Sequence, residues 1–439
     1  MRIRDSFGIR HSTFVIAAAL GVSLGAESQW PGWRGRDGSG ISADRNLPTE
    51  WAPGRNIKWK AEIPGRGHSS PVVWGNLVFV TTAIRGEQVP ERKAPVHLDF
   101  QKQPGYVHPD SVDVDYKHTL KVYAIDAKTG AVAWERIAYD GPMFDDRHRR
   151  NTFASPTMAA DGERAYAFFE SNGVYAYDFK GNLVWKKDLG TIIKAGLGPG
   201  TSPVIYKDLL ILQCDQEMGG GSYIVALNRK SGSEIWRTNR DNRRSWATPL
   251  IVNTGARDEL IASGAEAVVA YDPATGKELW RTDGTRSHPI PSPVSTKGVI
   301  FLTAGSSAKV VLAMKPGGEI LWRYNKGAAY VPSPIAVGDY LYLVSDAGLM
   351  TCLDAVTGER LYEGGRPPVA GAYFASPVAF DGKILLTSED GDSFLIKAGP
   401  VHEVLAASSI GETVWASPAI ADGTIYIRGD KHLFAIARP

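Results

Sequence analysis

Short apolar runs recur along the chain, and each follows a proline that is preceded by a serine or threonine. Within these runs apolar residues alternate with polar ones or continue for four to six positions, as in SPIAVGDYLYLVS. This pattern indicates β-strands and has no helical period. The eight pairs are Ser70-Pro71, Ser155-Pro156, Ser202-Pro203, Thr248-Pro249, Ser292-Pro293, Ser333-Pro334, Ser376-Pro377 and Ser417-Pro418. Successive prolines lie 85, 47, 46, 44, 41, 43 and 41 residues apart, and a period in the forties is typical of one four-stranded propeller blade.

A tight turn followed by an aromatic residue stands about midway between successive prolines. The Asp or Asn of the turn can accept hydrogen bonds from backbone N–H groups two residues on, and glycine supplies the positive φ that closes a hairpin. Each turn therefore joins two strands. Proline suits the start of the inner strand at the channel, and the Trp falls on the outer strand, against the neighbouring blade. The turns are DAKTG before Trp134, DFKG before Trp185, NRKSG before Trp236, DPATG before Trp280, KPGG before Trp322 and DAVTG before Tyr362.

The two ends of the chain complete a ring. The last unit stops at LFAIAR, its third strand, whereas NIKWKAEI at residues 56–63 has the pattern of an outer strand with no blade before it. We predict that residues 56–63 pair with the last unit, because closure protects the strand edges that an open array would expose. The predicted fold class is all-β, an eight-bladed β-propeller of four-stranded blades over residues 56–439.

The repeat resembles the one first described in enzymes that use pyrroloquinoline quinone (PQQ), whose blades carry the pattern A-x-D-x-x-T-G-x-x-x-W. That pattern stands here at residues 124–134, and the resemblance covers nearly all of residues 56–439. It is specific for the fold and not for one function. The PQQ-like repeat family includes quinoprotein alcohol dehydrogenases, the non-catalytic outer-membrane assembly lipoprotein BamB and many soluble members. The opening WPGWRGRDGSG, residues 30–40, is similar to the leader of secreted single-domain members.

Residues 1–26 have the pattern of a signal peptide. Three arginines precede an apolar stretch from about residue 13 to residue 25, which is too short to span a membrane. No Cys lies near the cleavage site, so the BamB-type lipid anchor is not expected. Residues 27–55 are expected to form a leader in coil conformation, without regular secondary structure. We therefore expect a periplasmic or secreted protein without a membrane span. Removal of residues 1–26 leaves 46 basic and 46 acidic residues, a balance that does not favour nucleic acid.

Two segments depart from the repeat. Residues 84–118 contain no Ser-Pro, no Thr-Gly turn and no Trp, so we expect an insertion between the second and third strands of the first blade. Residues 139–152, with DDRHRR at their centre, form a long connection to the second blade. Connections in an up-and-down meander alternate between the two faces of a propeller. Both departures should therefore lie on one face, together with the residues that precede each Ser-Pro at the channel mouth.

We expect a ligand or partner to bind at this channel mouth. Aromatic residues stand two positions before several of the hydroxyl residues, and cations occur in most of the between-blade loops. The cations form either a solvated rim or a funnel that attracts an anionic ligand into the concave mouth. The candidate binding residues are Arg66, His68, Arg150, Phe153, Arg244, Trp246, Tyr330, Phe374 and Trp415.

The insertion also contains the segment HPDSVDVDYKH. Imidazole and carboxylate side chains at this density can hold a divalent cation. The spacing matches no known ligand pattern, however, and an Asp-rich loop that is simply solvated is the other interpretation, so the metal assignment stays open. The residues concerned are His108, Asp110, Asp113, Asp115 and His118.

We favour a non-catalytic binding or scaffolding propeller, monomeric, whose partner is a protein or polysaccharide of the cell envelope. The alternative is a PQQ- and calcium-dependent dehydrogenase. The resemblance implies that such an enzyme holds PQQ against a Trp, clamps it with a disulfide of adjacent cysteines, and binds Ca²⁺ through Glu and Asn beside a catalytic Asp. Trp246 or Trp415 can supply the stacking surface, but Cys214 and Cys352 are far apart, and we expect both to be buried thiols.

No Glu, Asn or Asp of the chain can be assigned to a calcium site by motif. A hydrolase that uses the acidic insertion is a third possibility, but no nucleophile motif supports it. We therefore assign no catalytic residue and expect no cofactor, with PQQ and calcium as the alternative.

Overall fold

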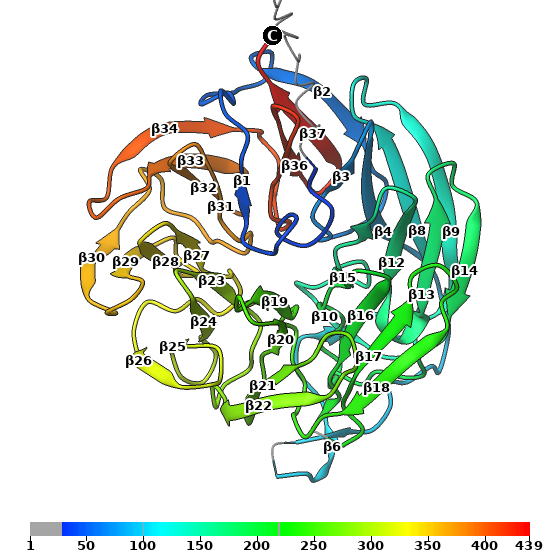
Figure 1. The fold of residues 1–439 in the computed structure, drawn as a ribbon. Helices are drawn as coiled ribbons and strands as arrows, with labels where there is room; N and C mark the ends of the chain where they lie inside the picture. The colour runs from blue at the N-terminus through cyan, green and yellow to red at the C-terminus, as the bar shows by residue number, and fades with distance from the viewer. Residues whose placement is uncertain (1–28, 100, 218–219) are drawn as a thin grey trace, which may run out of the picture.

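The computed structural model describes residues 29–99, 101–217 and 220–439, so the predicted signal peptide lies outside the described residues. Eight blades, each with four antiparallel strands, surround a central axis (Figure 1). Helical structure in the described residues is limited to short 3₁₀ turns, of which Glu170–Asn172 is one. No helix in this part of the chain is long and apolar enough to cross a membrane. The predicted all-β, eight-bladed propeller is confirmed.

The blades follow one another in chain order, each from its inner to its outer strand. They are β3 (Val72–Trp74), β4 (Leu77–Gln88), β8 (Tyr116–Asp126) and β9 (Val132–Pro142); β11 (Ala159–Ala160), β12 (Arg164–Phe168), β13 (Val174–Asp178) and β14 (Leu183–Lys187); β15 (Val204–Tyr206), β16 (Leu209–Cys214), β17 (Tyr223–Asn228) and β18 (Glu234–Asn239); β19 (Leu250–Asn253), β20 (Asp258–Ala262), β21 (Ala267–Tyr271) and β22 (Glu278–Asp283); β23 (Val294–Thr296), β24 (Val299–Ala304), β25 (Val310–Met314) and β26 (Ile320–Tyr324); β27 (Ile335–Val337), β28 (Tyr340–Val344), β29 (Met350–Asp354) and β30 (Arg360–Gly365); β31 (Val378–Phe380), β32 (Lys383–Thr387), β33 (Asp392–Lys397) and β34 (Val404–Ser409); and β35 (Ala419–Ala421), β36 (Thr424–Arg428), β37 (His432–Ala437) and β2 (Ile57–Glu62).

The eighth blade closes the ring in the predicted way. Its outer strand is β2, which pairs antiparallel with β37 in a register that places Trp59 opposite Ala435. The first and last parts of the chain therefore share one sheet (Figure 1). Such closure leaves the ring without an unpaired blade.

The repeated Trp and Gly of the sequence meet at the junctions between blades. Trp236 Nε1 donates a 3.2 Å hydrogen bond to the carbonyl oxygen of Pro273 in the turn of the next blade. A Cβ at Gly276 of that turn would lie 2.4 Å from the indole ring, and its φ is +70°. Glycine is thus required both by the backbone conformation and by the space under the Trp. The same donation joins Trp59 to Ala127, Trp134 to Phe179, Trp185 to Arg229 and Trp322 to Val356.

A belt of hydrogen bonds connects the inner ends of the blades around the channel. The backbone N–H of one hydroxyl residue donates to the hydroxyl oxygen of its counterpart in the next blade, over 2.8–3.1 Å, and seven such bonds run from Ser70 to Ser417. In the second blade Thr157 takes this position instead of Ser155. The Ser155-Pro156 pair is therefore two residues out of register with the repeat.

The leader packs across the end of the channel opposite to the insertions. Trp30 pairs through its backbone with Val73 of the first blade, and β1 (Ile41–Ser42) adds a parallel strand to β31 of the seventh. Between them the buried guanidinium of Arg34 donates to the carbonyl oxygens of Pro334 and Pro377, at 3.0 and 3.1 Å. The predicted coil is thus held to several blades.

The insertion is shorter than predicted, because the strands beside it are longer. β4 continues to Gln88 and β8 begins at Tyr116, so residues 84–88 and 116–118 belong to the first blade. The segment between them contains the small sheet of β5 (His97–Leu98) and β6 (Pro104–Tyr106). Its strand β7 (Ser111–Val112) pairs with β10 (Arg147–His148) of the connection to the second blade. The two departures from the repeat therefore meet on one face, as expected.

Candidate functional site

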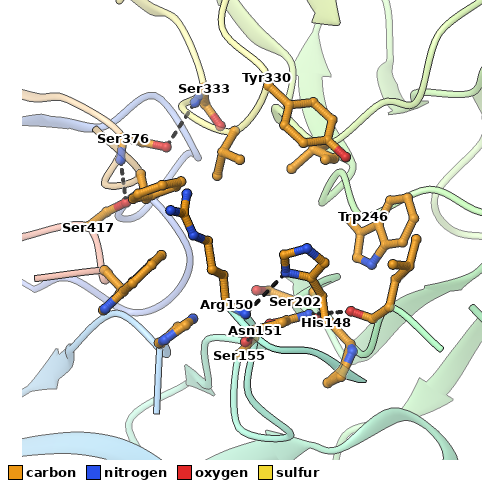
Figure 2. A pocket seen from close by; sticks show the side chains of 18 of the residues that line it. His148, Arg150, Asn151, Ser155, Ser202, Trp246, Tyr330, Ser333, Ser376 and Ser417 are labelled. Carbon is orange, nitrogen blue, oxygen red and sulfur yellow. Dashed lines mark hydrogen bonds between the residues drawn. The ribbon is translucent and has the colours of Figure 1, made fainter. Parts of the chain in front are cut away.

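A cavity of about 500 Å³ occupies the channel mouth on the face that carries the insertion. This volume lies in the range of about 300–1,000 Å³ that small-molecule sites occupy. Figure 2 shows Trp246, Tyr330, Arg150 and His148 arranged around it. Ser202, Ser333, Ser376 and Ser417 of the belt also line it. Residues from most of the blades and from both departures line the cavity.

The floor of the cavity consists of the belt and one residue of the leader. Ser202, Thr248, Ser333 and their counterparts line it, and their positions are fixed by the blade-to-blade hydrogen bonds. Trp33 of the leader borders both this cavity and a second one at the opposite end of the channel. Its Nε1 donates a 2.9 Å hydrogen bond to Ser292 Oγ. The leader therefore separates the two ends of the channel.

A stack of rings forms one wall. Phe374 lies on Trp415 with ring centroids 4.5 Å apart, and Trp415 lies on His68 at 5.1 Å with nearly parallel planes. The guanidinium of Arg150 stands 5.6 Å from the Phe374 centroid. Burial, followed by the charge of Arg66, holds the pKa of His68 well below its usual range, so this ring contributes a neutral surface to the wall.

The opposite wall contains Trp246, whose Nε1 donates to the carbonyl oxygen of Gly198 over 2.9 Å. The ammonium of Lys194 lies 5.5 Å from its ring centroid. This lysine is buried and paired with Glu170 at 3.4 Å, so it belongs to the support of the wall and not to a solvated rim. The rings of both walls therefore line one space, with a cation beside each wall.

Six of the nine candidate residues line this cavity, and three do not. Phe153 is displaced by the two-residue register shift of the second blade and packs edge-to-face on His118 at 4.7 Å. Arg66 lies behind the wall, where it donates to the carbonyl oxygen of Arg149 and faces Trp415. Arg244 is 2 % exposed, and burial lowers its pKa. The lining candidates are His68, Arg150, Trp246, Tyr330, Phe374 and Trp415.

Several lining residues were missing from the sequence prediction. His148, Arg149 and Asn151 come from the connection between the first two blades, which the sequence marked only as an irregular segment. Asn151 Nδ2 donates to the carbonyl oxygens of Leu197 and Pro199 at 2.8 and 2.9 Å, so it fastens this segment to the third blade. The only available signal was the density of charged residues in DDRHRR.

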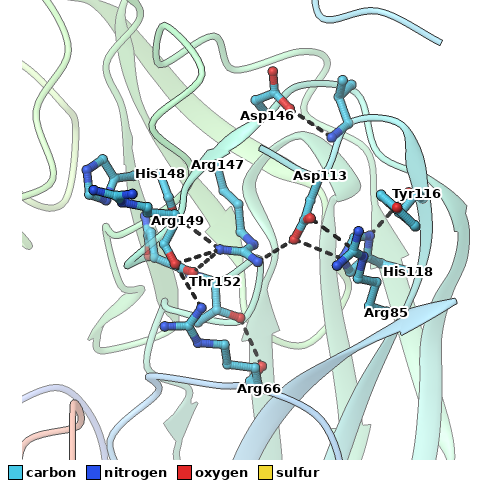
Figure 3. A network of polar contacts seen from close by, with 12 residues as sticks. Arg66, Arg85, Asp113, Tyr116, His118, Asp146, Arg147, His148, Arg149 and Thr152 are labelled. Atoms are coloured by element: carbon cyan, nitrogen blue, oxygen red, sulfur yellow. Dashed lines mark hydrogen bonds and ion pairs between the residues drawn. The ribbon is translucent and has the colours of Figure 1, made fainter. Parts of the chain in front are cut away.

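The Asp and His residues of the insertion divide into two groups. Asp113 is buried and pairs with Arg147, with Arg85 at 3.6 Å and with His118 at 3.8 Å (Figure 3). Burial lowers the pKa of His118. This group joins the insertion to the adjoining strand and connection. Asp115 accepts a hydrogen bond from Gln88.

His108 and Asp110 lie apart from that network and line the cavity. A ligand atom from each of them lies within 4.8 Å of one from His148. Of the five residues named in the sequence as possible metal ligands, the structure thus brings two to the cavity and adds a third from another segment.

A sequence model of the family described as outer membrane protein assembly factor BamB matches residues 105–266 and 264–438. The chain belongs to this BamB family. The search of curated proteins gave no match. BamB from Moraxella catarrhalis is similar in structure, with a TM-score of 0.53 and 17 % identity over 82 % of this chain and 97 % of that one.

Two dehydrogenases share the fold of this BamB-family propeller. A europium-containing methanol dehydrogenase has a TM-score of 0.62 and 13 % identity over 92 % of this chain and 90 % of that one. Quinohemoprotein alcohol dehydrogenase from Comamonas testosteroni has a TM-score of 0.63 and 13 % identity over 94 % and 81 %. Likeness at these identities shows the common propeller fold alone.

The cavity of this BamB-family chain is poorly suited to calcium. Ca²⁺ takes six to eight oxygen ligands, chiefly carboxylates and carbonyls. Among the described residues that line the cavity, Asp110 is the only carboxylate, and its Oδ1 pairs with Arg149 at 3.0 Å. The remaining charged or titratable lining residues are Arg, His and Tyr330. Cys214 and Cys352 are buried free thiols, as expected, and burial raises the pKa of each to about 12.

Proposed function

We propose that this protein is an exported, non-catalytic binding propeller that holds the end of an acidic polysaccharide of the cell envelope at its channel mouth. The observation that carries the proposal is the aromatic cavity with Arg150 beside it. Flat apolar rings suit the faces of sugar rings, and a guanidinium suits a carboxylate. Phe374, at the end of its stack with Trp415, and Trp246 on the opposite wall line one space with Arg150.

The closed floor supports binding of a chain end and not of a threaded chain. Trp33 separates the mouth cavity from the opposite end of the channel, and the belt hydroxyls around it are fixed by hydrogen bonds between blades. A rigid cavity of this size takes one or a few sugar units at low cost in conformational entropy. A protein partner that inserts a side chain of similar chemistry is the other outcome that the experiments below distinguish.

The test is a titration of the mature protein with oligogalacturonate and with a neutral oligosaccharide of equal length, followed by tryptophan fluorescence and calorimetry. We expect one-to-one binding of the acidic chain only. Arg150→Ala and Phe374→Ala should each weaken it about tenfold, which corresponds to roughly 1.4 kcal/mol. Arg286→Ala is the matched control, because this arginine is 83 % exposed and pairs with Asp283 outside the cavity.

A parallel titration with PQQ and Ca²⁺ tests the dehydrogenase alternative. Tight one-to-one binding of PQQ, abolished by chelation of calcium, would contradict the non-catalytic proposal and call for dehydrogenase assays. Equal affinity for the acidic and the neutral oligosaccharide would remove the role given to Arg150. If neither sugar binds, the cavity does not recognise acidic polysaccharide, and a protein partner becomes the better account.

A further inference from the structure

The two segments that interrupt the repeat place two imidazoles and one carboxylate together at the rim of the cavity. His108 and Asp110 come from the insertion, and His148 comes from the connection between the first two blades. One ligand atom from each lies within 4.8 Å of the others. His148 Nε2 is 3.4 Å from Asp110 Oδ2, and all three residues line the cavity and are partly exposed.

The backbone fixes the relative position of the three groups. β7 pairs with β10 in a register that sets His148 opposite Ser111. The backbone N–H of Arg149 donates to the carbonyl oxygen of Asp110 over 2.8 Å. The guanidinium of Arg149 also holds Asp110 Oδ1 at 3.0 Å, which leaves Oδ2 on the side of His148. A carboxylate with one oxygen anchored by a neighbour is the arrangement that orients a metal ligand.

We propose that His108, Asp110 and His148 bind one divalent first-row transition-metal ion, such as Zn²⁺, at the rim of the cavity. Two imidazoles and one carboxylate are a ligand set that Zn²⁺ and Fe²⁺ use in proteins. Three protein ligands leave at least one coordination position open, and all three residues line the cavity. The nitrogen ligands exclude calcium as the preferred ion. This site is independent of the polysaccharide proposal.

Metal binding requires a change of tautomer in both rings. His108 Nδ1 accepts the backbone N–H of Asp110, and His148 Nδ1 accepts that of Arg150, each at 3.1 Å. The neutral rings therefore carry their proton on Nε2. When Nε2 binds a metal, the proton relocates to Nδ1 and the backbone bond is lost. This exchange and the positive charge of Arg149 lower the affinity, so we expect weaker binding than at a closed structural zinc site.

A purely structural role of the three residues makes a different prediction. The pairs of Asp110 with Arg149 and His148 would by themselves hold the connection to the insertion. Those two pairs do not involve a second imidazole, yet the rings of His108 and His148 meet edge to face with centroids 5.4 Å apart. Substitution of His108 therefore distinguishes a metal site from a salt-bridge cluster.

The test uses mature protein purified without a histidine tag and treated with EDTA. Co²⁺ is added and followed by visible absorption, and Zn²⁺ affinity is measured by competition and calorimetry. We expect one equivalent to bind. His108→Gln, Asp110→Asn and His148→Gln should each weaken binding at least about tenfold, as loss of a ligand does. His402→Gln is the matched control, because that ring packs on Tyr362 away from the cavity.

Zinc-edge X-ray absorption of the wild-type protein provides a readout that does not depend on variants. Two imidazoles and a shell of oxygen neighbours are expected. Failure of the wild type to bind a stoichiometric ion overturns the proposal, and so does a His108→Gln variant that binds as tightly as the control. A spectrum without imidazole scattering does the same. Circular dichroism of each variant shows whether a loss of metal binding comes from unfolding. If it does, the X-ray absorption spectrum of the wild-type protein decides whether the site exists.

Discussion

The blade junctions and the decorated mouth of this propeller are held together in different ways. At the junctions one contact recurs around the ring, in which an outer-strand Trp lies over the turn of the next blade. The contacts that hold the insertion at the mouth do not recur from blade to blade. Ser111 Oγ donates to the carbonyl oxygen of Gly196 over 2.7 Å, and the backbone N–H of Leu98 donates to Glu217 over 3.0 Å.

This difference separates stability from specialisation. Each junction joins neighbours in the ring, so a defect in one junction weakens the closed structure as a whole. The insertion extends from the first blade over the mouth and is held to the third blade by a few polar contacts. Loops of this kind can change while the scaffold stays intact. Substitutions at the junctions should therefore lower global stability, whereas substitutions in the insertion should affect the mouth alone.

The largest effect is expected for Gly276→Ala. The added Cβ would lie 2.4 Å from the Trp236 ring, at a φ of +70°. The left-handed conformation costs about 1–2 kcal/mol for an L-residue, and displacement of the packed indole adds about 1–3 kcal/mol. Chemical denaturation should therefore show a loss of roughly 2–5 kcal/mol in the free energy of unfolding.

Gly298→Ala separates the two contributions. Gly298 has a φ of +74°, but a Cβ added there would have no other atom within 4 Å, since that side of the backbone is open. Its replacement should cost only the conformational part, about 1–2 kcal/mol. If Gly276→Ala and Gly298→Ala are equally destabilising, the packing of Trp over Gly adds nothing at the junctions, and the comparison between junctions and mouth loses its basis.

The next effect concerns the belt. Ser292 Oγ accepts both the backbone N–H of Thr248 and the indole N–H of Trp33, so Ser292→Ala leaves two donors without this partner. The buried N–H of Thr248 costs about 1–3 kcal/mol when it is left unsatisfied, and the part-buried indole N–H of Trp33 costs less. Ser333→Ala is the control, because Ser333 Oγ accepts the N–H of Ser292 alone. Thermal unfolding should show a larger loss for Ser292→Ala than for Ser333→Ala, and equal losses would show that the leader contributes nothing there.

The fold could be predicted from the sequence because its determinants are local and repeated. The Asp, Gly and Trp of each turn, as in Asp126, Gly130 and Trp134, satisfy short-range requirements of a hairpin and of the adjacent blade. Ring closure by β2 followed from counting strands. The second blade was misaligned, because the sequence contains Ser155-Pro156 two residues before Thr157, and only the hydrogen bonds show which hydroxyl belongs to the belt.

The site could be predicted only in part. Trp246, Phe374 and Trp415 were found because their distance from the Ser-Pro or Thr-Pro pair is fixed by the blade. His148 was not found, since its place at the cavity depends on the pairing of β10 with β7, two short segments outside the repeat. The charge of a loop residue was also not enough to place it at the rim. Arg244 is buried, although its position in a between-blade loop suggested the rim.

A buried histidine holds the insertion to the rest of the mouth. His97 Nε2 is 3.0 Å from Asp145 Oδ1, and its Nδ1 is 3.2 Å from Glu217 Oε2. Burial by itself lowers the pKa of His97, but the hydrogen bonds and charges of Asp145 and Glu217 outweigh it, and the net shift is upward. The proton therefore stabilises the contact between β5, the first connection and the third blade.

The smallest global effect and the clearest local one are expected from this histidine. Because its pKa in the folded state lies above the unfolded value of 6.5, the stabilisation is fully present below about pH 6.5 and is lost as the pH rises through the folded pKa. Hydrogen exchange of residues 89–99 and 101–115, corrected for the intrinsic rate, should become severalfold faster across that range. His97→Gln should abolish this pH dependence and change the global free energy of unfolding by less than about 0.5 kcal/mol.

The matched control is His432→Gln, because the ring of His432 pairs with Glu412 far from the insertion, in the eighth blade. This variant should leave the exchange of the insertion as it is in the wild type. Exchange that responds to pH equally in the His97→Gln variant would mean that another group holds the insertion, while a large global loss would mean that the insertion is part of the ring's stability and not an addition to it.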